Sequence, residues 1–257
     1  MSSIYLTALP AMLIVGALVW ALSVLINNVS IVDSLWSLLF LIAASVFLAS
    51  SEVLSERSLI VFTLVTIWSL RLSLHITIRN WGEGEDYRYQ AIRAKNEPGF
   101  VLKSLYLVFG LQVVLAWIIS APLLPGASSL SPLGWIDAFA VSLWIVGFVF
   151  ESVGDLQLTK FKADSNNLGN VLNTGLWRYT RHPNYFGDFC VWWAFWLFAL
   201  STGAWWTVFA PILMSLLLLK VSGVAMLEKT IGERRPEYND YTRHTNAFFP
   251  GPSRARN

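Results

Sequence analysis

Apolar residues gather in seven runs along this chain, separated by polar segments. The runs cover residues 4–26, 30–50, 58–78, 101–121, 135–155, 184–201 and 204–222. A membrane-spanning helix needs about 20 predominantly apolar residues, with a usable range of about 17–25. The pattern predicts an all-α, polytopic integral membrane protein with about seven transmembrane helices. Six helices are the alternative, because the run at 184–201 is close to the short limit.

Basic residues give the predicted helices an orientation. They gather in the segments 79–103 and 157–183 and in the tail from Lys220 onward, whereas the connections 122–134 and 201–204 contain none. Cytoplasmic loops of membrane proteins are enriched in Lys and Arg. We therefore expect these three basic segments in the cytoplasm, the N-terminus outside and the C-terminus inside.

The composition agrees with this class and narrows the chemistry. The chain is 55% hydrophobic and 13% charged, against about 25% charged residues in a typical soluble domain. The first run has no basic region before it, which favours a retained span over a cleaved signal peptide. One cysteine and three widely spaced histidines give neither a disulfide framework nor a zinc-ligand pattern. We expect no metal site and no nucleic-acid partner.

Polar residues recur near one end of several predicted spans. A buried charge in a membrane costs about 2.5–3.5 kcal/mol on insertion scales, so such residues usually face a cavity or one another. The pattern predicts a pocket that opens to the cytoplasm and is closed above by apolar helices. The residues concerned are Asn27, Asn28, Asp33, Arg71, His75, Glu151, Asp155, Asn184 and Asp188.

Two acids near the end of the fifth run are unusual. Glu151 and Asp155 are four residues apart, hence on one helical face, where like charges repel and the helix dipole is unfavourable. They either pair with Arg71, Lys160 or Lys162, or accept hydrogen bonds from a ligand. We favour the ligand, because buried titratable groups concentrate at functional sites.

The stretch RHPNYFGD (181–188) opens the sixth run. Pro183 suits the first turn of a helix, so Asn184, Tyr185 and Asp188 lie where backbone N–H groups are free. Cations of the preceding loop, Lys160, Lys162, Arg178 and Arg181, suit a phosphate-bearing ligand or anionic lipid headgroups. The tyrosines and the Phe-Phe-Pro sequence of the tail predict that the tail docks back onto the protein.

These residues carry a resemblance. RHPNYFGD, the later glutamate, tyrosines, arginine and FFP, and the earlier VDSLW, WSLRLSLHI and RNWGEGEDYRYQ resemble the steroid 5α-reductase-like bacterial membrane proteins, which are related to the isoprenylcysteine methyltransferase-type membrane enzymes. The resemblance covers nearly the whole chain. It implies one membrane domain over 1–257 in the bacterial inner membrane, with 1–100 on the substrate side and 101–257 binding the cofactor.

The implied activity is NADPH-dependent reduction of a C=C bond conjugated to a carbonyl in a lipophilic, steroid- or isoprenoid-like substrate from the bilayer. Asp155, Lys162, Asn184, Asp188 and Arg71 match cofactor-binding positions of the steroid reductases, and Glu151 stands where the animal enzymes carry asparagine. The full expected cofactor-binding set is Arg71, Glu151, Asp155, Lys162, Arg178, Tyr179, Arg181, His182, Asn184, Tyr185, Asp188, Glu228, Tyr241 and Arg243.

The residues expected to contact the substrate differ from those of the animal steroid reductases. The animal enzymes polarise the ketone with a glutamate of the second helix and a tyrosine one turn before the arginine of the third. Here the second run contains no glutamate, and Trp68 precedes Arg71 by one turn. The substrate therefore stays open, and Asp33, His75 and Tyr87 are the candidates for the catalytic donor.

Two alternatives use the same residues. One is an S-adenosylmethionine-dependent membrane methyltransferase acting on a lipid-like substrate, in which RHPNY and Glu228 would hold the cofactor. The other is a non-catalytic lipid-binding membrane protein, which would bind neither NADPH nor S-adenosylmethionine.

Overall fold

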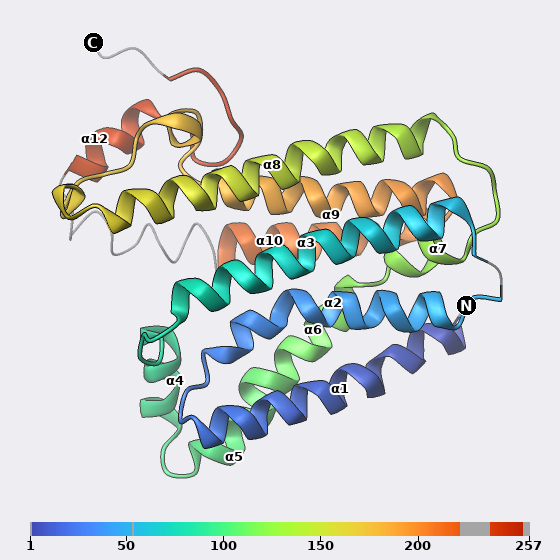
Figure 1. Cartoon of the computed structure of the whole chain (residues 1–257), viewed down its shortest axis with the longest axis horizontal. Helices are drawn as coiled ribbons and strands as arrows, with labels where there is room; N and C mark the ends of the chain where they lie inside the picture. Colours follow the sequence, from blue (N-terminus) through green and yellow to red (C-terminus); the bar gives the residue numbers. More distant parts are fainter. Residues whose placement is uncertain (1, 53, 222–236, 254–257) are drawn as a thin grey trace. The chain divides into compact units, whose positions relative to one another are not determined.

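The computed structural model describes residues 2–52, 54–221 and 237–253 (Figure 1). Helices and their connections make up these ranges, and no strand occurs within them. The all-α prediction is confirmed for this part of the chain.

Five of the predicted runs form helices that are long and apolar enough to cross a membrane. They are α1 (Ser2–Leu25), α2 (Ile31–Ala49), α3 (Glu56–Asn80), the continuous helix Phe100–Ile119 and α8 (Trp135–Ala163). The helix Phe100–Ile119 consists of α5 (Phe100–Ser104), the π-helix η1 (Leu105–Gly110) and α6 (Leu111–Ile119). Such a set of helices is typical of a membrane protein.

The last two runs are also helical, but their helices are not among those that are both long and apolar enough to cross a membrane. Helix α9 (Pro183–Ser201) contains Asn184, Asp188 and three tryptophans, which lower its mean hydropathy. The helix that follows is short; it is built from η4 (Trp205–Val208), α10 (Phe209–Leu216) and the π-helix η5 (Leu217–Val221). The predicted number of seven spans and their orientation stay predictions.

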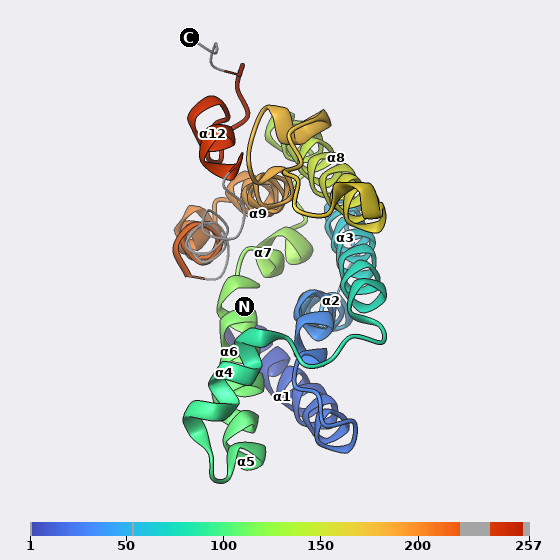
Figure 2. The same ribbon diagram turned by 90° about the vertical axis from the view of Figure 1, so that its left-hand side faces the viewer.

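The chain divides into two compact units. The first comprises residues 1–133 and 198–207, and its central helix α2 contacts α1, α3, α6 and the short helix α7 (Leu123–Ser128). Figure 2 shows this arrangement from the side. Phe40, Phe47 and Trp68 are fully buried in this unit, which gives it an aromatic core.

The second unit comprises residues 134–197 and 208–257. Its described part contains α8, α9, α10, η5 and the tail helix α12 (Glu237–His244), with the 3-10 helices η2 (Ser165–Asn167) and η3 (Gly175–Arg178) in the connection between α8 and α9. The expectation of a single domain with a division near residue 100 stays a prediction.

Two elements differ from the sequence-based picture. The polar segment after α3 forms the helix α4 (Tyr87–Asn96), which Asp86 caps by accepting a hydrogen bond from the Arg88 N–H. Helix α8 continues to Ala163, beyond the apolar run that ends at 155. Residues 156–163 contain neither Gly nor Pro, so nothing stops the helix there, and Lys160 and Lys162 lie on its last turns rather than in a loop.

Candidate functional site

Helices α8 and α9 touch through glycines. A β-carbon built on Gly187 of α9 would lie 2.5 Å from the Gly147 carbonyl oxygen of α8, and one built on Gly147 would lie 2.6 Å from the Gly187 oxygen. Farther along α8, a β-carbon on Gly154 would lie 3.1 Å from the Asn184 nitrogen. Small residues allow helices in membranes to approach this closely, and side chains beside the glycines are thereby brought together.

Polar side chains line this α8–α9 interface. Glu151, Asp155 and Asp188 are all buried. The Asn184 side-chain amide donates a 3.0 Å hydrogen bond to Asp155 Oδ1. The Asn184 Oδ1 atom is also buried and has no hydrogen-bond partner within the described residues. The predicted meeting of Glu151 and Asp155 with the first turns of α9 is therefore found, and Asn184 keeps one acceptor available to a ligand.

The RHPNY stretch has the predicted local structure. Helix α9 begins at Pro183, and the Phe186 N–H donates to the His182 carbonyl in its first turn. His182 is buried, and its ring stacks on Tyr185 with centroids 5.6 Å apart. This stacking fixes the entry to α9 next to Asn184.

The tail docks onto the connection between α8 and α9, as predicted. Arg181 donates through Nη1 to the carbonyls of Thr242 (3.0 Å) and Thr245 (3.1 Å). The Thr180 hydroxyl donates to the Phe248 carbonyl at 2.7 Å, and Phe248 packs edge-on against Phe186 and Phe189 of α9. Arg181 is thus engaged with the backbone of the tail.

Trp177 links the tail to the α8–α9 interface. Its indole N–H donates to the Gly154 carbonyl of α8 at 3.2 Å, and its own carbonyl accepts a hydrogen bond from the Tyr241 hydroxyl of α12. Gly154 itself packs on the backbone of Asn184. A short chain of contacts therefore runs from α12 to the polar residues between α8 and α9.

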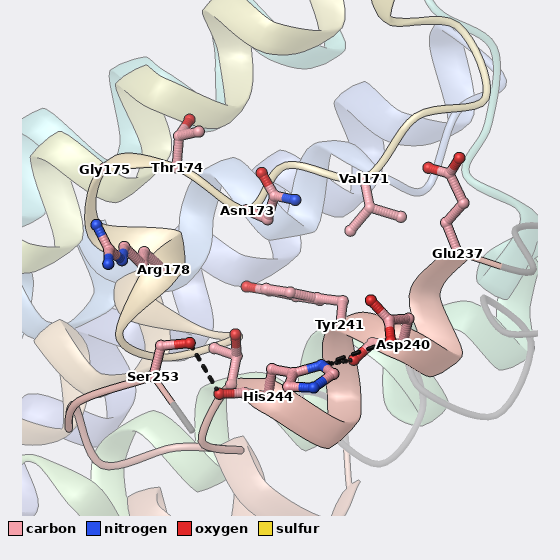
Figure 3. Close-up of a pocket in the computed structure, with 11 residues that line it drawn as sticks. Val171, Asn173, Thr174, Gly175, Arg178, Glu237, Asp240, Tyr241, His244 and Ser253 are labelled. Atoms are coloured by element: carbon pink, nitrogen blue, oxygen red, sulfur yellow. Dashed lines mark hydrogen bonds and ion pairs between the residues drawn. The ribbon is translucent and has the colours of Figure 1, made fainter. Parts of the chain in front are cut away.

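A cavity of about 930 Å³ lies between this connection and α12 (Figure 3). Arg178 provides a cation to its wall, and Tyr241 contributes an aromatic ring. Two acids, Glu237 and Asp240, line the side formed by α12. On the same helix, the main-chain carbonyl oxygen of Asp240 lies 2.8 Å from His244 Nδ1. The other lining residues are Val171, Asn173, Thr174, Gly175, His244, Thr245 and Ser253. The cavity suits a polar ligand that carries both an anionic group and hydroxyls or amines.

The remaining predicted cofactor residues divide into three groups. Lys162, Tyr179 and Arg243 are exposed on the second unit. Arg71 is half-buried on α3 in the first unit, as is the catalytic candidate His75. Glu228 lies outside the described residues.

The first unit holds a second polar cluster around the catalytic candidate Asp33. The Asp33 carboxylate, in the first turn of α2, accepts hydrogen bonds from Arg88 Nη2 (2.8 Å) and from the Tyr89 hydroxyl. Gln112 Nε2 donates to the same Tyr89 oxygen at 3.2 Å. Gln112 is the second residue after the π-helix η1, and π-helical turns are frequent at functional sites.

The tyrosine of this cluster is Tyr89, whereas the catalytic candidate Tyr87 does not contribute to it in the contacts described. Tyr87 is 59% exposed, whereas Tyr89 is 6% exposed. Burial, together with the negative charge of Asp33, raises the pKa of Tyr89 above its ordinary value of 10.0. The phenol therefore keeps its proton throughout the physiological range.

Helix α4 is tied to the first unit by Glu85. Its carboxylate accepts from Arg93 at 2.8 and 2.9 Å and from the Val29 N–H at 3.0 Å. The hydrogen bonds from Arg93 hold the pKa of Glu85 below its ordinary value of 4.5. This ion pair fixes the helix that carries Tyr89.

Sequence reasoning missed Tyr89, Gln112, Trp177 and the glycine contacts. For the glycines a signal existed, because Gly147 and Gly154 are seven residues apart in a predicted span and so share a helical face. Tyr89 and Gln112 carried no comparable signal. Within the described residues, no group of three His, Cys, Asp or Glu side chains is arranged to hold a metal ion.

The comparisons with known proteins specify a family. The chain belongs to the family described as "Protein of unknown function (DUF1295)", which matches residues 19–245. A relative from the fission yeast Schizosaccharomyces pombe, "Uncharacterized protein C594.04c", is 29% identical over 267 aligned residues, which cover 92% of this chain and 77% of the yeast protein. No solved structure matches.

Proposed function

We propose that this protein is a membrane-embedded, NADPH-dependent reductase of a C=C bond conjugated to a carbonyl in a lipophilic substrate. The observation that carries the proposal is the connection, through Trp177, between the polar α8–α9 interface and the cavity beside α12. A dinucleotide has a polyanionic part and a neutral, amide-bearing part. The second unit offers a cation-containing cavity and a buried amide-acid pair, one for each part.

The described residues fit this cofactor. Asn184 and Asp155 provide an acceptor and a carboxylate for ribose hydroxyls or the carboxamide. Arg178, in the cavity wall, is the cation for phosphate, whereas Arg181 holds the tail. Tyr241 can stack against a planar ring. The bound cofactor would supply the hydride.

The remaining chemistry falls to side chains. Reduction of a conjugated C=C bond needs a donor for the developing enolate oxygen and a proton for the α-carbon. Asp33, His75 and Tyr87 stay the proposed candidates for these donors. Tyr89 donates its hydroxyl proton to the Asp33 carboxylate, so we assign it the role of positioning Asp33. Tyr89→Phe is expected to lower kcat while NADPH binds with unchanged affinity.

The test of the cofactor is energy transfer from tryptophan to the nicotinamide during titration of the detergent-purified protein. We expect micromolar affinity for NADPH and weaker binding of NADH. Asn184→Ala and Asp155→Ala should each weaken NADPH binding at least tenfold, and Arg178→Gln should weaken NADPH binding more than NADH binding. Unchanged NADPH affinity in Asp155→Ala and Asn184→Ala would contradict the proposal.

One observation favours S-adenosylmethionine as the alternative cofactor. The α8–α9 interface buries three acids, and two further acids line the cavity, which suits a ligand with an amine and a sulfonium. Protection from thermal unfolding by S-adenosylmethionine, without any NADPH signal, would support the methyltransferase. If neither nucleotide binds, the protein is better described as a non-catalytic lipid-binding protein.

The proposed setting is a cell membrane crossed seven times, with the N-terminus outside. Helix α9 and the helix that follows it would supply the sixth and seventh spans. The three basic segments, and with them the cofactor cavity, would then face the cytoplasm.

A further inference from the structure

The connection between α8 and α9 presents a leucine to its surroundings. Leu168 is 83% exposed at a turn that follows the 3-10 helix η2. Exposed leucines are ordinary on the lipid-facing sides of spans. Here the leucine lies outside the spans, on a polar segment.

Hydrogen bonds hold this turn in one shape. The Leu168 N–H donates to the Ser165 carbonyl at 3.2 Å, and the Asn167 side-chain amide donates to the Phe161 carbonyl at 3.1 Å. Asp164 accepts from the Asn166 N–H at 2.9 Å. Gly169 follows with φ +86°, a left-handed conformation that favours glycine. The turn is therefore formed before any partner binds.

The length of α8 sets the depth of the turn. Helix α8 begins with Trp135, which is 79% exposed and suits a membrane–water interface. A hydrocarbon layer of about 30 Å is crossed by about 20 residues at 1.5 Å each, which ends near residue 155. The last turns of α8, with the exposed Lys160 and Lys162, then lie among the lipid headgroups together with Leu168.

We propose that Lys160, Lys162 and Leu168 form a binding surface for anionic phospholipids, with Leu168 inserted among the headgroups. Charge complementarity selects the lipid, because two exposed cations precede the turn on the last turns of α8. A lysine near an anionic surface strengthens binding by about five-fold.

This surface bears on the rest of the second unit. The same connection continues into Asn173, Thr174 and Arg178, which line the cavity beside α12. Lipid binding at the turn would fix one end of the cavity wall. The proposal needs no nucleotide and stands independently of the proposed reductase activity.

A fluorescent probe at the turn tests the proposal. In the full-length Cys190→Ala protein, Leu168→Cys is labelled with an environment-sensitive dye and placed in phosphatidylcholine nanodiscs with or without phosphatidylglycerol. We expect blue-shifted emission and quenching by lipids that carry a spin label near the headgroup, both stronger with phosphatidylglycerol. Adding Lys160→Gln and Lys162→Gln should remove the dependence on phosphatidylglycerol.

The matched control is Asn173→Cys on the same connection, which faces the cavity and should be quenched at least three-fold less. Size-exclusion chromatography of each labelled protein verifies that it is folded. Absence of quenching at position 168, or quenching equal to that at 173, would overturn the insertion of Leu168. Quenching that is equally strong with and without phosphatidylglycerol would show that the two lysines do not select anionic lipid.

Discussion

At Gly187 the backbone of α9 leaves no room for a side chain, because the Gly147 carbonyl of α8 lies 2.5 Å from where a β-carbon would stand. Gly187→Ala must therefore push α8 and α9 apart. We expect a loss of about 1–3 kcal/mol, the usual cost of overpacking, and a melting temperature several degrees lower in detergent. Gly84→Ala, at a position with nothing within 4 Å, should leave the melting temperature unchanged.

Glu85 makes the free energy of unfolding of the first unit depend on pH in the acid range. Its folded-state pKa is lowered by the hydrogen bonds from Arg93, so its contribution is full above the unfolded-state pKa and is lost as the pH falls through the folded-state value. Thermal unfolding at a series of pH values should show Glu85→Gln less stable than the native chain above about pH 5. The two should converge in stronger acid; a gap that widens with acid would contradict this assignment.

Individual residues were predicted unevenly, for physical reasons. Asp155 and Asn184 could be placed at the same depth from sequence, because buried polar residues of membrane helices usually face a cavity or one another. The hydrogen bond between them was not predicted, since the partners expected for Asp155 were Arg71, Lys160, Lys162 or a ligand. The role of Arg181 could not be distinguished from that of Arg178 in the sequence. Its partners are main-chain carbonyls of the tail, and carbonyls are the same at every residue of the sequence.

Among the elements, α12 depends most clearly on a few contacts. Arg181 donates to the Thr242 carbonyl within α12 and to the Thr245 carbonyl just after it, and a hydrogen bond to a charged group contributes about 1.5–3 kcal/mol. Arg181→Ala should therefore speed hydrogen exchange in residues 237–250 at least tenfold. Exchange measured by mass spectrometry checks this. Arg178→Ala, on the neighbouring cavity wall, serves as the control and should leave exchange in that segment unchanged.

Element boundaries followed the apolar pattern where the pattern was strong. The run predicted at 184–201 corresponds to α9 at Pro183–Ser201, because Pro183 marks the start. Helix α4 was missed. Its ten residues are polar on most faces, and Glu85, Asp86 and Arg88 stabilise it through contacts with α2 and the turn before it, which no local pattern reveals.

For the whole molecule, the orientation in the membrane is open to a direct test. In the Cys190→Ala protein, Leu130→Cys lies in a connection without basic residues and Asn166→Cys in a basic one. A membrane-impermeant maleimide added to intact cells should label position 130 at once and position 166 only after permeabilisation. The reverse pattern would show that the proposed orientation is wrong.

At this scale the sequence predicted the helical membrane class but not the division into two units. Hydropathy reports how apolar each segment is, and it contains no information about which helices pack together. The first unit takes in residues 198–207 from the far end of α9 and the turn after it, a long-range association that apolar runs alone do not encode.

The way the tail is held has a consequence for how this protein changes over generations. The carbonyls of Thr242, Thr245, Asn246 and Phe248 accept the hydrogen bonds from the connection between α8 and α9. Every amino acid supplies such a carbonyl, so many side-chain replacements at 242, 245 and 246 would leave the docking intact. Insertions or deletions there would shift all of the acceptors out of register. Among relatives, the length of this segment is therefore expected to be kept more strictly than its residues.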